Sequence, residues 1–229
     1  MINLDISTYK NNYDLNKAIG LFLSIKTDTV LSADERNFLT AYSGDGGLIK
    51  QGAEGKGVLY EFYTPEKIID LCWHLVRTHR SHTSTYRVLE PACGTGRFID
   101  SISEDPRFEI TGMEIDPISS KISQLLYPNT DIQPRAFETL FIDNNRVLGY
   151  RGSSFDCVIG NPPYGPFQNF YKGLGEGKFC QRYEDYFVCR GLDVLAEGGL
   201  LVMVMPSIFL NKVTKSSHKE IFGKSCLID

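Results

Sequence analysis

The fold is decided at residues 86–98, which read Tyr-Arg-Val-Leu-Glu-Pro-Ala-Cys-Gly-Thr-Gly-Arg-Phe. A strand-like run ends in a turn that holds Gly94 and Gly96, and a helical pattern follows. Glycine lets the backbone take conformations that other residues avoid and approach a ligand closely. Because open parallel sheets bind ligands beyond the carboxyl ends of their strands, this stretch predicts a cofactor loop.

The residues around the turn indicate which cofactor it suits. A Gly-x-Gly pair alone is a weak signal, and a dinucleotide loop would need a third glycine where Ile99 stands. Glu90 would repel a pyrophosphate but attract a cation, which favours S-adenosylmethionine, a molecule with an ammonium, a sulfonium and no phosphate. Glu114, twenty residues beyond Gly94, is placed to accept hydrogen bonds from two ribose hydroxyls. Taken alone, Glu114 is equally well explained as an exposed carboxylate at a strand end.

The chain beyond residue 64 alternates between helical and strand-like segments. A helix is predicted to start at Thr64-Pro65-Glu66, with the threonine as its cap and with apolar positions at Ile68, Ile69, Leu71, Cys72 and Leu75. Short apolar runs at 86–89, 109–112, 155–159 and 200–205 predict strands. Such alternation is typical of a doubly wound, mainly parallel α/β sheet covered on both faces.

The first part of the chain is predicted to be a separate helical extension. Residues 1–45 have helical periodicity, and Ser32-Ala-Asp-Glu35 has the form of a capping box. Residues 43–57 contain six glycines, too many for the interior of a helix or strand, and predict a linker. We therefore expect a helical extension and linker over 1–50 and a catalytic domain over 51–229.

Composition excludes several classes of protein. The 229 residues carry a net charge of −4, which argues against tight nucleic-acid binding through a broad basic surface. The sequence has no apolar run long enough to span a membrane and no basic, apolar leader at its start, so a cytoplasmic protein is expected. The six cysteines are scattered without a metal-ligand spacing, and no metal is predicted.

A second informative turn, Asn161-Pro162-Pro163-Tyr164, follows the strand-like run 155–160. Two consecutive prolines remove both backbone donors, so the turn presents acceptors, namely the Asn161 side-chain oxygen and the Pro162 carbonyl. Two acceptors suit an exocyclic amine such as adenine N6, whose lone pair they would free for attack on a methyl group. Tyr164 offers a face on which an extruded base can stack. The plain alternative is a proline-rich surface turn.

The N6-adenine DNA methyltransferases carry similar motifs in the same order: E-P-A-C-G-T-G at 90–96, E-I-D at 114–116 and N-P-P-Y at 161–164. The segment 61–65, E-F-Y-T-P, resembles their motif X. The resemblance covers roughly residues 33–212 and is greatest to the large methylases of phages and conjugative elements. It implies a Rossmann-like fold, S-adenosylmethionine as cofactor with S-adenosylhomocysteine as product, and methylation of a flipped-out adenine in DNA within a modification or restriction-modification system.

The resemblance also implies roles for particular residues. Tyr63 and Thr64 would contact the methionine end of the cofactor. Phe137 would pack on its adenine, while the acid that accompanies this ring in many relatives is either absent here or displaced to Glu138. The complete expected cofactor site is Tyr63, Thr64, Glu90, Pro91, Ala92, Gly94, Gly96, Glu114, Ile115, Phe137, Glu138 and Asn161, and the expected catalytic residues are Asn161, Pro162, Pro163 and Tyr164.

Two expectations concern partners. The family fold has further strands and a target-recognition domain, so we expect this chain to be part of a longer polypeptide, or to act with a specificity partner, and to bind DNA weakly by itself. Two other functions remain open on the sequence: a methyltransferase for a guanine amine in RNA or a glutamine amide in protein, and a non-catalytic module that binds the cofactor or DNA.

Overall fold

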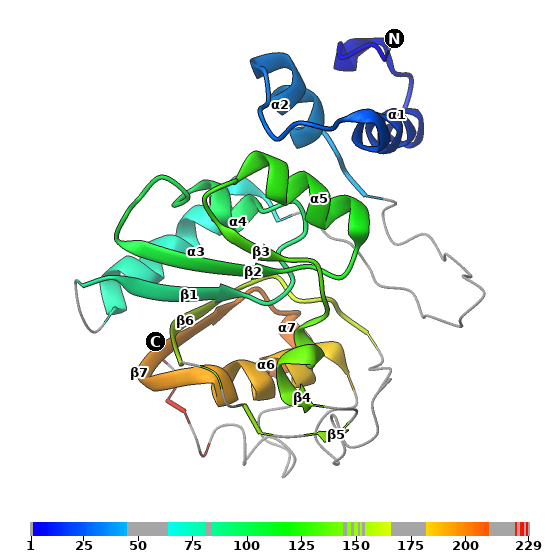
Figure 1. The fold of residues 1–229 in the computed structure, drawn as a ribbon. Coiled ribbons are helices and arrows are strands. Elements are labelled where there is room, and N and C mark those ends of the chain that lie inside the picture. Colours follow the sequence, from blue (N-terminus) through cyan, green and yellow to red (C-terminus); the bar gives the residue numbers. More distant parts are fainter. Residues whose placement is uncertain are drawn as a thin grey trace.

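The computed structural model describes residues 2–44, 64–80, 84–143, 146–147, 149–150, 152, 154–165, 182–210, 223, 225–226 and 228. A five-stranded sheet with the order β3-β2-β1-β6-β7 forms the centre, and every neighbouring pair in it is parallel (Figure 1). This confirms the predicted parallel α/β architecture. Its strands are β1 (Tyr86–Glu90), β2 (Phe108–Met113), β3 (Asp131–Gln133), β6 (Phe155–Gly160) and β7 (Leu195–Met203).

The strand register brings the two informative turns to one edge of the sheet. β1 pairs with β2 up to Glu90 opposite Gly112, and with β6 through Leu89 opposite Val158. Since all these strands run in the same direction, their carboxyl ends meet at the same edge. The turn after β1 and the turn after β6 are therefore neighbours.

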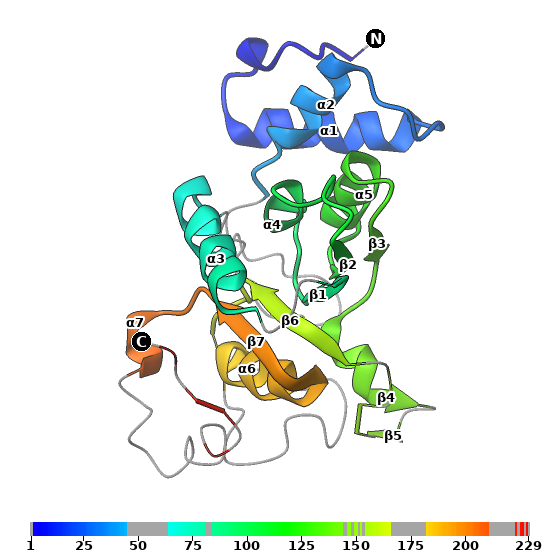
Figure 2. The same cartoon turned by 90° about the vertical axis from the view of Figure 1, so that its left-hand side faces the viewer.

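Helices cover both faces of the sheet (Figure 2). On one face lie α3 (Glu66–His79), α4 (Arg97–Asp100) and α5 (Pro117–Leu126), and on the other lies α6 (Tyr183–Val194). Each face encloses its own cluster of buried apolar side chains. The remaining elements are the 3-10 helices η1 (Ile6–Thr8) and η2 (Phe137–Phe141), the antiparallel pair β4 (Ile142–Asp143) and β5 (Arg146–Val147), and α7 (Ser207–Leu210).

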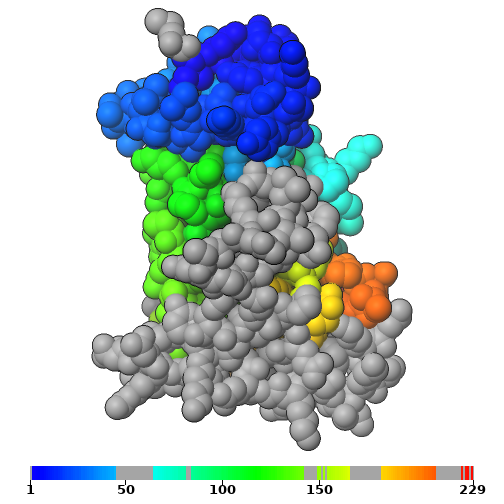
Figure 3. Space-filling model, turned by 90° about the vertical axis from the view of Figure 1, so that its right-hand side faces the viewer, coloured from blue at the N-terminus to red at the C-terminus, as the bar shows by residue number. Residues whose placement is uncertain are grey.

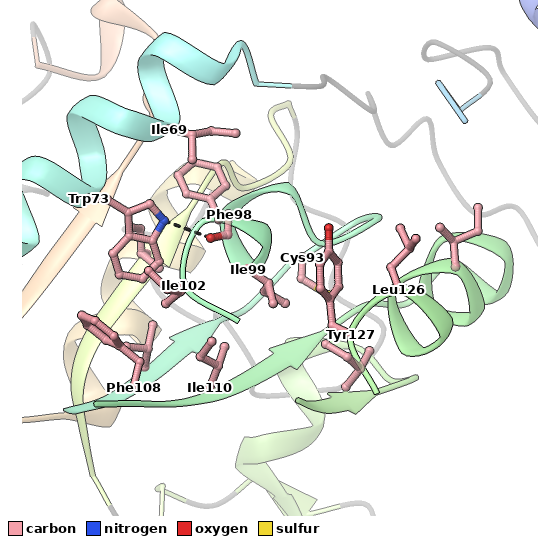
Figure 4. Close-up of a cluster of buried hydrophobic side chains, with 14 of the residues drawn as sticks. Ile69, Trp73, Cys93, Phe98, Ile99, Ile102, Phe108, Ile110, Leu126 and Tyr127 are labelled. Atoms are coloured by element: carbon pink, nitrogen blue, oxygen red, sulfur yellow. Dashed lines mark hydrogen bonds between the residues drawn. The ribbon is translucent and has the colours of Figure 1, made fainter. Parts of the chain in front are cut away.

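Trp73 anchors α3 to the sheet. Its side chain is buried, and its Nε1–H donates to the Phe98 carbonyl at 2.9 Å (Figure 4). The predicted helix is confirmed, and only some of the apolar positions named for it are buried. Ile68, Leu71 and Leu75 are exposed, whereas Trp73 and Val76 lie inside with Ile69 and Cys72, because the larger indole faces the core.

The predicted threonine cap of α3 was wrong. Pro65 is the N-cap residue, and no side chain caps this helix. The Thr64 hydroxyl instead accepts a hydrogen bond from a residue of the turn after β6, as described below.

The N-terminal helices α1 (Asn12–Ile25) and α2 (Ala33–Thr40) contact α5 (Figures 1 and 3). Arg36 donates to the Leu126 carbonyl at 2.9 Å, and Lys26 pairs with Glu35 at 2.8 Å. The capping box is confirmed, since Ser32 and Glu35 exchange both expected hydrogen bonds. The predicted linker falls mostly outside the described residues, as does the domain boundary at residue 50. No helix in the described ranges is long and apolar enough to cross a membrane.

Candidate active site

The turn after β1 depends on two glycines in different ways. Gly94 and Gly96 have φ angles of 54° and 87°, in the left-handed region that favours glycine. A Cβ on Gly96 would lie 2.4 Å from Cε2 of Tyr127, whereas a Cβ on Gly94 would have no described atom within 4 Å. Gly96 therefore allows close packing against α5, and Gly94 leaves one side of the turn open.

Glu114 fastens this turn to the end of β2. Its Oε2 accepts from the Gly94 amide at 2.7 Å, and its Oε1 accepts from the Asp116 amide at 2.7 Å. Each oxygen of a carboxylate has two lone pairs, so a carboxylate can accept more than one hydrogen bond at each oxygen. The next side chain, Ile115, is 53% exposed at the same edge. The carboxylate thus both shapes the turn and remains suited to a ribose.

Glu90, at the end of β1, is a buried carboxyl. Its side chain is 2% exposed, and its Oε2 has no hydrogen-bond partner among the described residues. Burial, with a smaller contribution from the nearby Glu114, raises the pKa of this carboxyl well above its ordinary value. A cation bound beside it would offset both effects. The donor set therefore fits a positively charged ligand such as S-adenosylmethionine.

The Asn161 side chain joins the turn after β6 to the start of α3. Its Nδ2 donates to the Thr64 hydroxyl at 3.0 Å, and Thr64 is buried. The Asn161 Oδ1 accepts from the Tyr164 hydroxyl, which also lies 2.8 Å from the Val204 carbonyl beyond β7. These contacts hold the Asn161 amide at both its nitrogen and its oxygen, which fixes its orientation.

The rest of the turn is held close to the sheet. Pro162 is buried and Pro163 is half-buried, and the Val204 amide donates to the Gly160 carbonyl at 3.0 Å. Burial raises the pKa of Tyr164 to about 12, so its phenol is neutral at physiological pH. The Tyr164 hydroxyl is directed at Asn161 and Val204, and stacking of its ring on a base stays a prediction.

The structure does not bring Phe137 and Glu138, the residues predicted to contact the adenine of the cofactor, to the turn after β1. Phe137 is 1% exposed, and its ring lies against Phe141, Tyr186 and Phe187 in the second core cluster. A ligand could contact this ring only if one of its neighbours moved. Glu138 is partly buried, and desolvation raises the pKa of its carboxyl. The roles of both residues stay predictions.

Of the other expected site residues, Pro91 and Ala92 lie in the described part of the chain and Tyr63 does not. Pro91 is buried and Ala92 half-buried in the turn after β1. Tyr63 lies outside the described residues. Sequence reasoning missed Tyr127, which packs on Gly96, and Glu184, which contacts the end of the turn after β6. No group of three or more metal-ligating side chains occurs in the part of the chain that the structure describes.

Comparison with known proteins identifies the class first. A crystal structure from Listeria monocytogenes, described as a putative class I S-adenosylmethionine-dependent methyltransferase, aligns with a TM-score of 0.53 at 14% identity. The alignment covers 97% of this chain and 60% of that one. The fold is thus that of the Rossmann-like methyltransferases, whose cofactor is S-adenosylmethionine.

The sequence relatives narrow the class. The family described as Eco57I restriction-modification methylase matches residues 115–228. Defense against restriction protein B of Escherichia phage P1 is 30% identical over 83% of this chain. Modification methylase CviBIII of Paramecium bursaria Chlorella virus NC1A is 28% identical over 72% of it. The chain thus contains a domain of the restriction-modification methylase family. It spans 8% of the length of the phage protein and 41% of that of the viral methylase.

Proposed function

We propose that this chain transfers a methyl group from S-adenosylmethionine to the N6 amine of adenine in DNA. The observation that carries the proposal is the contact between Asn161 and Thr64, because it fixes the acceptor turn after β6 to the start of α3, while the strand register places that turn beside the turn after β1. A methyl donor held at one turn would then face an amine held at the other. Relatives described as modification methylases support DNA as the substrate.

The cofactor side of the site uses the fixed turn after β1. Bound S-adenosylmethionine supplies a methyl group on a sulfonium, and transfer leaves S-adenosylhomocysteine. Glu90 would place its carboxylate near the positive methionine part, beside Gly94 and Gly96 and the motif X residues Tyr63 and Thr64. Glu114 would accept the ribose hydroxyls, and Ile115 would cover one face of the adenine. Phe137 and Glu138 are assigned to its other contacts by the family resemblance alone.

The target side uses acceptors rather than a titrating base. The Asn161 Oδ1 and the Pro162 carbonyl would accept the two N6 hydrogens, which localises the nitrogen lone pair toward the methyl carbon. When the nitrogen takes the methyl group and the S–C bond breaks, positive charge would develop on the nitrogen, and these two dipoles would stabilise it until the amine loses a proton to solvent. An amide oxygen has two lone pairs, so the amine could bind to Oδ1 without displacing the Tyr164 hydroxyl.

Recognition of DNA is expected to need more than this chain. A net charge of −4 provides little general attraction to phosphates, and an adenine must leave the duplex to reach the turn. We therefore propose that further domains, or a specificity partner, supply tight and sequence-specific binding. The chain alone should bind DNA weakly and with a steep dependence on salt.

The test follows labelled methyl groups from the cofactor into duplex DNA, RNA and a protein extract. We expect label in DNA, and we expect Asn161→Ala to remove it. Label found only in RNA or only in protein would reject adenine in DNA as the target. Cofactor binding without transfer to any of the three would favour a non-catalytic module.

A further inference from the structure

The N-terminus of α6 contains a carboxylate that is completely buried. Glu184 is 0% exposed, and it is the second residue of α6, whose first turn is buried. Its Oε2 accepts from the Gly165 amide at 3.1 Å, and Arg182 contacts its Oε1 through Nε. Gly165 directly follows the acceptor turn 161–164.

A second contact holds the same glycine from the same helix. The Tyr183 amide donates to the Gly165 carbonyl at 2.9 Å. Gly165 has a φ angle of 118°, a conformation that side chains rarely allow, so the chain changes direction here. Both backbone polar groups of Gly165 are thus bonded to the first turn of α6.

Burying Glu184 costs free energy, and the formation of α6 does not require this burial. Removing a carboxylate from water costs several kcal/mol unless it is paired and hydrogen-bonded. An acid in the first turn of a helix is stabilised by the helix dipole when it is exposed, so α6 itself gains little from burying it. Arg182 pairs with the buried carboxylate and Gly165 donates to it, so both offset this cost, and of these two partners Gly165 is the one that adjoins the acceptor turn. After burial, Glu184 also contributes electrostatically to the raised pKa of Tyr164, the residue before Gly165.

We propose that Glu184 is a positioning residue that sets the place of the Asn161 and Pro162 acceptors by holding Gly165 against α6. Thr64 secures the start of the turn at Asn161, and Glu184 secures its end four residues later. Acceptors fixed at both ends do not need to be ordered when the amine arrives, which lowers the barrier to transfer. This inference rests on the proposed function, since it assigns a task to the same turn.

Two conservative variants of Glu184 separate the effect of side-chain length from the effect of charge. Glu184→Asp keeps the charge but shortens the side chain by one methylene, so it can no longer reach the Gly165 amide. Glu184→Gln keeps the reach and an acceptor oxygen but loses the charge. We expect Glu184→Asp to lower kcat about tenfold or more, as for a lost hydrogen bond to a charged group, with the Kd for S-adenosylmethionine unchanged. Glu184→Gln should keep kcat within about threefold of the wild type, because the Gly165 hydrogen bond remains.

The matched control is the same pair of substitutions at Glu197, which is exposed on β7. Hydrogen exchange of the peptide that contains 161–165, measured by mass spectrometry, is the second readout and does not depend on activity. We expect faster exchange in Glu184→Asp only. Equal exchange in Glu184→Asp and the wild type, or a larger loss of kcat in Glu184→Gln than in Glu184→Asp, would overturn the proposal. If the wild type methylates no DNA, the proposed function fails, and the exchange result alone decides the role of Glu184.

Discussion

The substitution Gly96→Ala should destabilise the protein by an amount that the structure predicts. An alanine in the left-handed region costs about 1–2 kcal/mol. Its methyl group would lie 2.4 Å and 2.8 Å from two ring carbons of Tyr127, so that buried ring has to move. This movement would break the 3.1 Å hydrogen bond that the Tyr127 hydroxyl donates to Asp100, which contributes about 1 kcal/mol to stability. The total loss in the free energy of unfolding is about 2–3 kcal/mol.

Gly94→Ala is the matched control. Gly94 shares the left-handed conformation, but no described atom lies within 4 Å of the position that an added methyl group would take, so only about 1–2 kcal/mol should be lost. Urea unfolding followed by circular dichroism measures both variants. Cofactor titration should show the opposite order among folded proteins, because the methyl of Gly94→Ala points into the open side of the turn. Equal stability losses in the two variants would refute the packing role of Tyr127.

Three further changes test other parts of the site. Glu90→Gln should weaken cofactor binding. It should also raise the free energy of unfolding at neutral pH, because the variant carries no charge there. The pKa of Glu90 is raised above 4.5 in the folded state, so the wild type loses stability as the pH increases past that value. Urea unfolding from pH 5 to 8 measures this slope. Tyr164→Phe should keep kcat/KM within a few-fold, whereas Tyr164→Ala, which also removes the stacking face, should lower it about tenfold or more in methyl-transfer kinetics. Trp73→Phe should cost about 2 kcal/mol in urea unfolding, because the Phe98 carbonyl loses its donor and the smaller ring leaves a void.

Each of these expectations has a result that contradicts it. A pH slope of stability that is identical in Glu90→Gln and the wild type would mean that the carboxyl is not strained by burial. A loss in Tyr164→Phe as large as in Tyr164→Ala would place the hydroxyl, not the ring, in the reaction. Unchanged stability of Trp73→Phe would show that the indole hydrogen bond contributes nothing to the packing of α3.

The sequence was sufficient for the elements whose signals are local. The glycine turn after 86–90, the capping box at Ser32 and the parallel alternation all follow from spacing and residue type, and the structure confirms them. The short strand β3 was not among the predicted runs, since three residues contain too little periodicity to identify a strand. β7 begins at Leu195, five residues before its predicted start, because an irregular segment precedes its apolar core.

The sequence singled out residues for the candidate site, but it gave no signal for the contacts between them. Asn161 and Glu90 follow from motif chemistry, yet the hydrogen bond from Asn161 to Thr64 joins positions 97 residues apart, and no local pattern signals it. Glu184 looks like an ordinary acid at a helix start until its burial is known. Phe137 was placed by resemblance against the cofactor, whereas only the fold shows that other rings enclose it.

The identity of the methylated nucleoside tests the proposed reaction most directly. Duplex DNA incubated with the protein and cofactor carrying a deuterated methyl group would be digested to nucleosides and analysed by mass spectrometry against an N6-methyldeoxyadenosine standard. The account predicts a deuterated N6-methyldeoxyadenosine peak with the wild type and none with Asn161→Ala. A deuterated methyl group on cytosine or guanine, or an equal N6-methyladenine peak from Asn161→Ala, would contradict it.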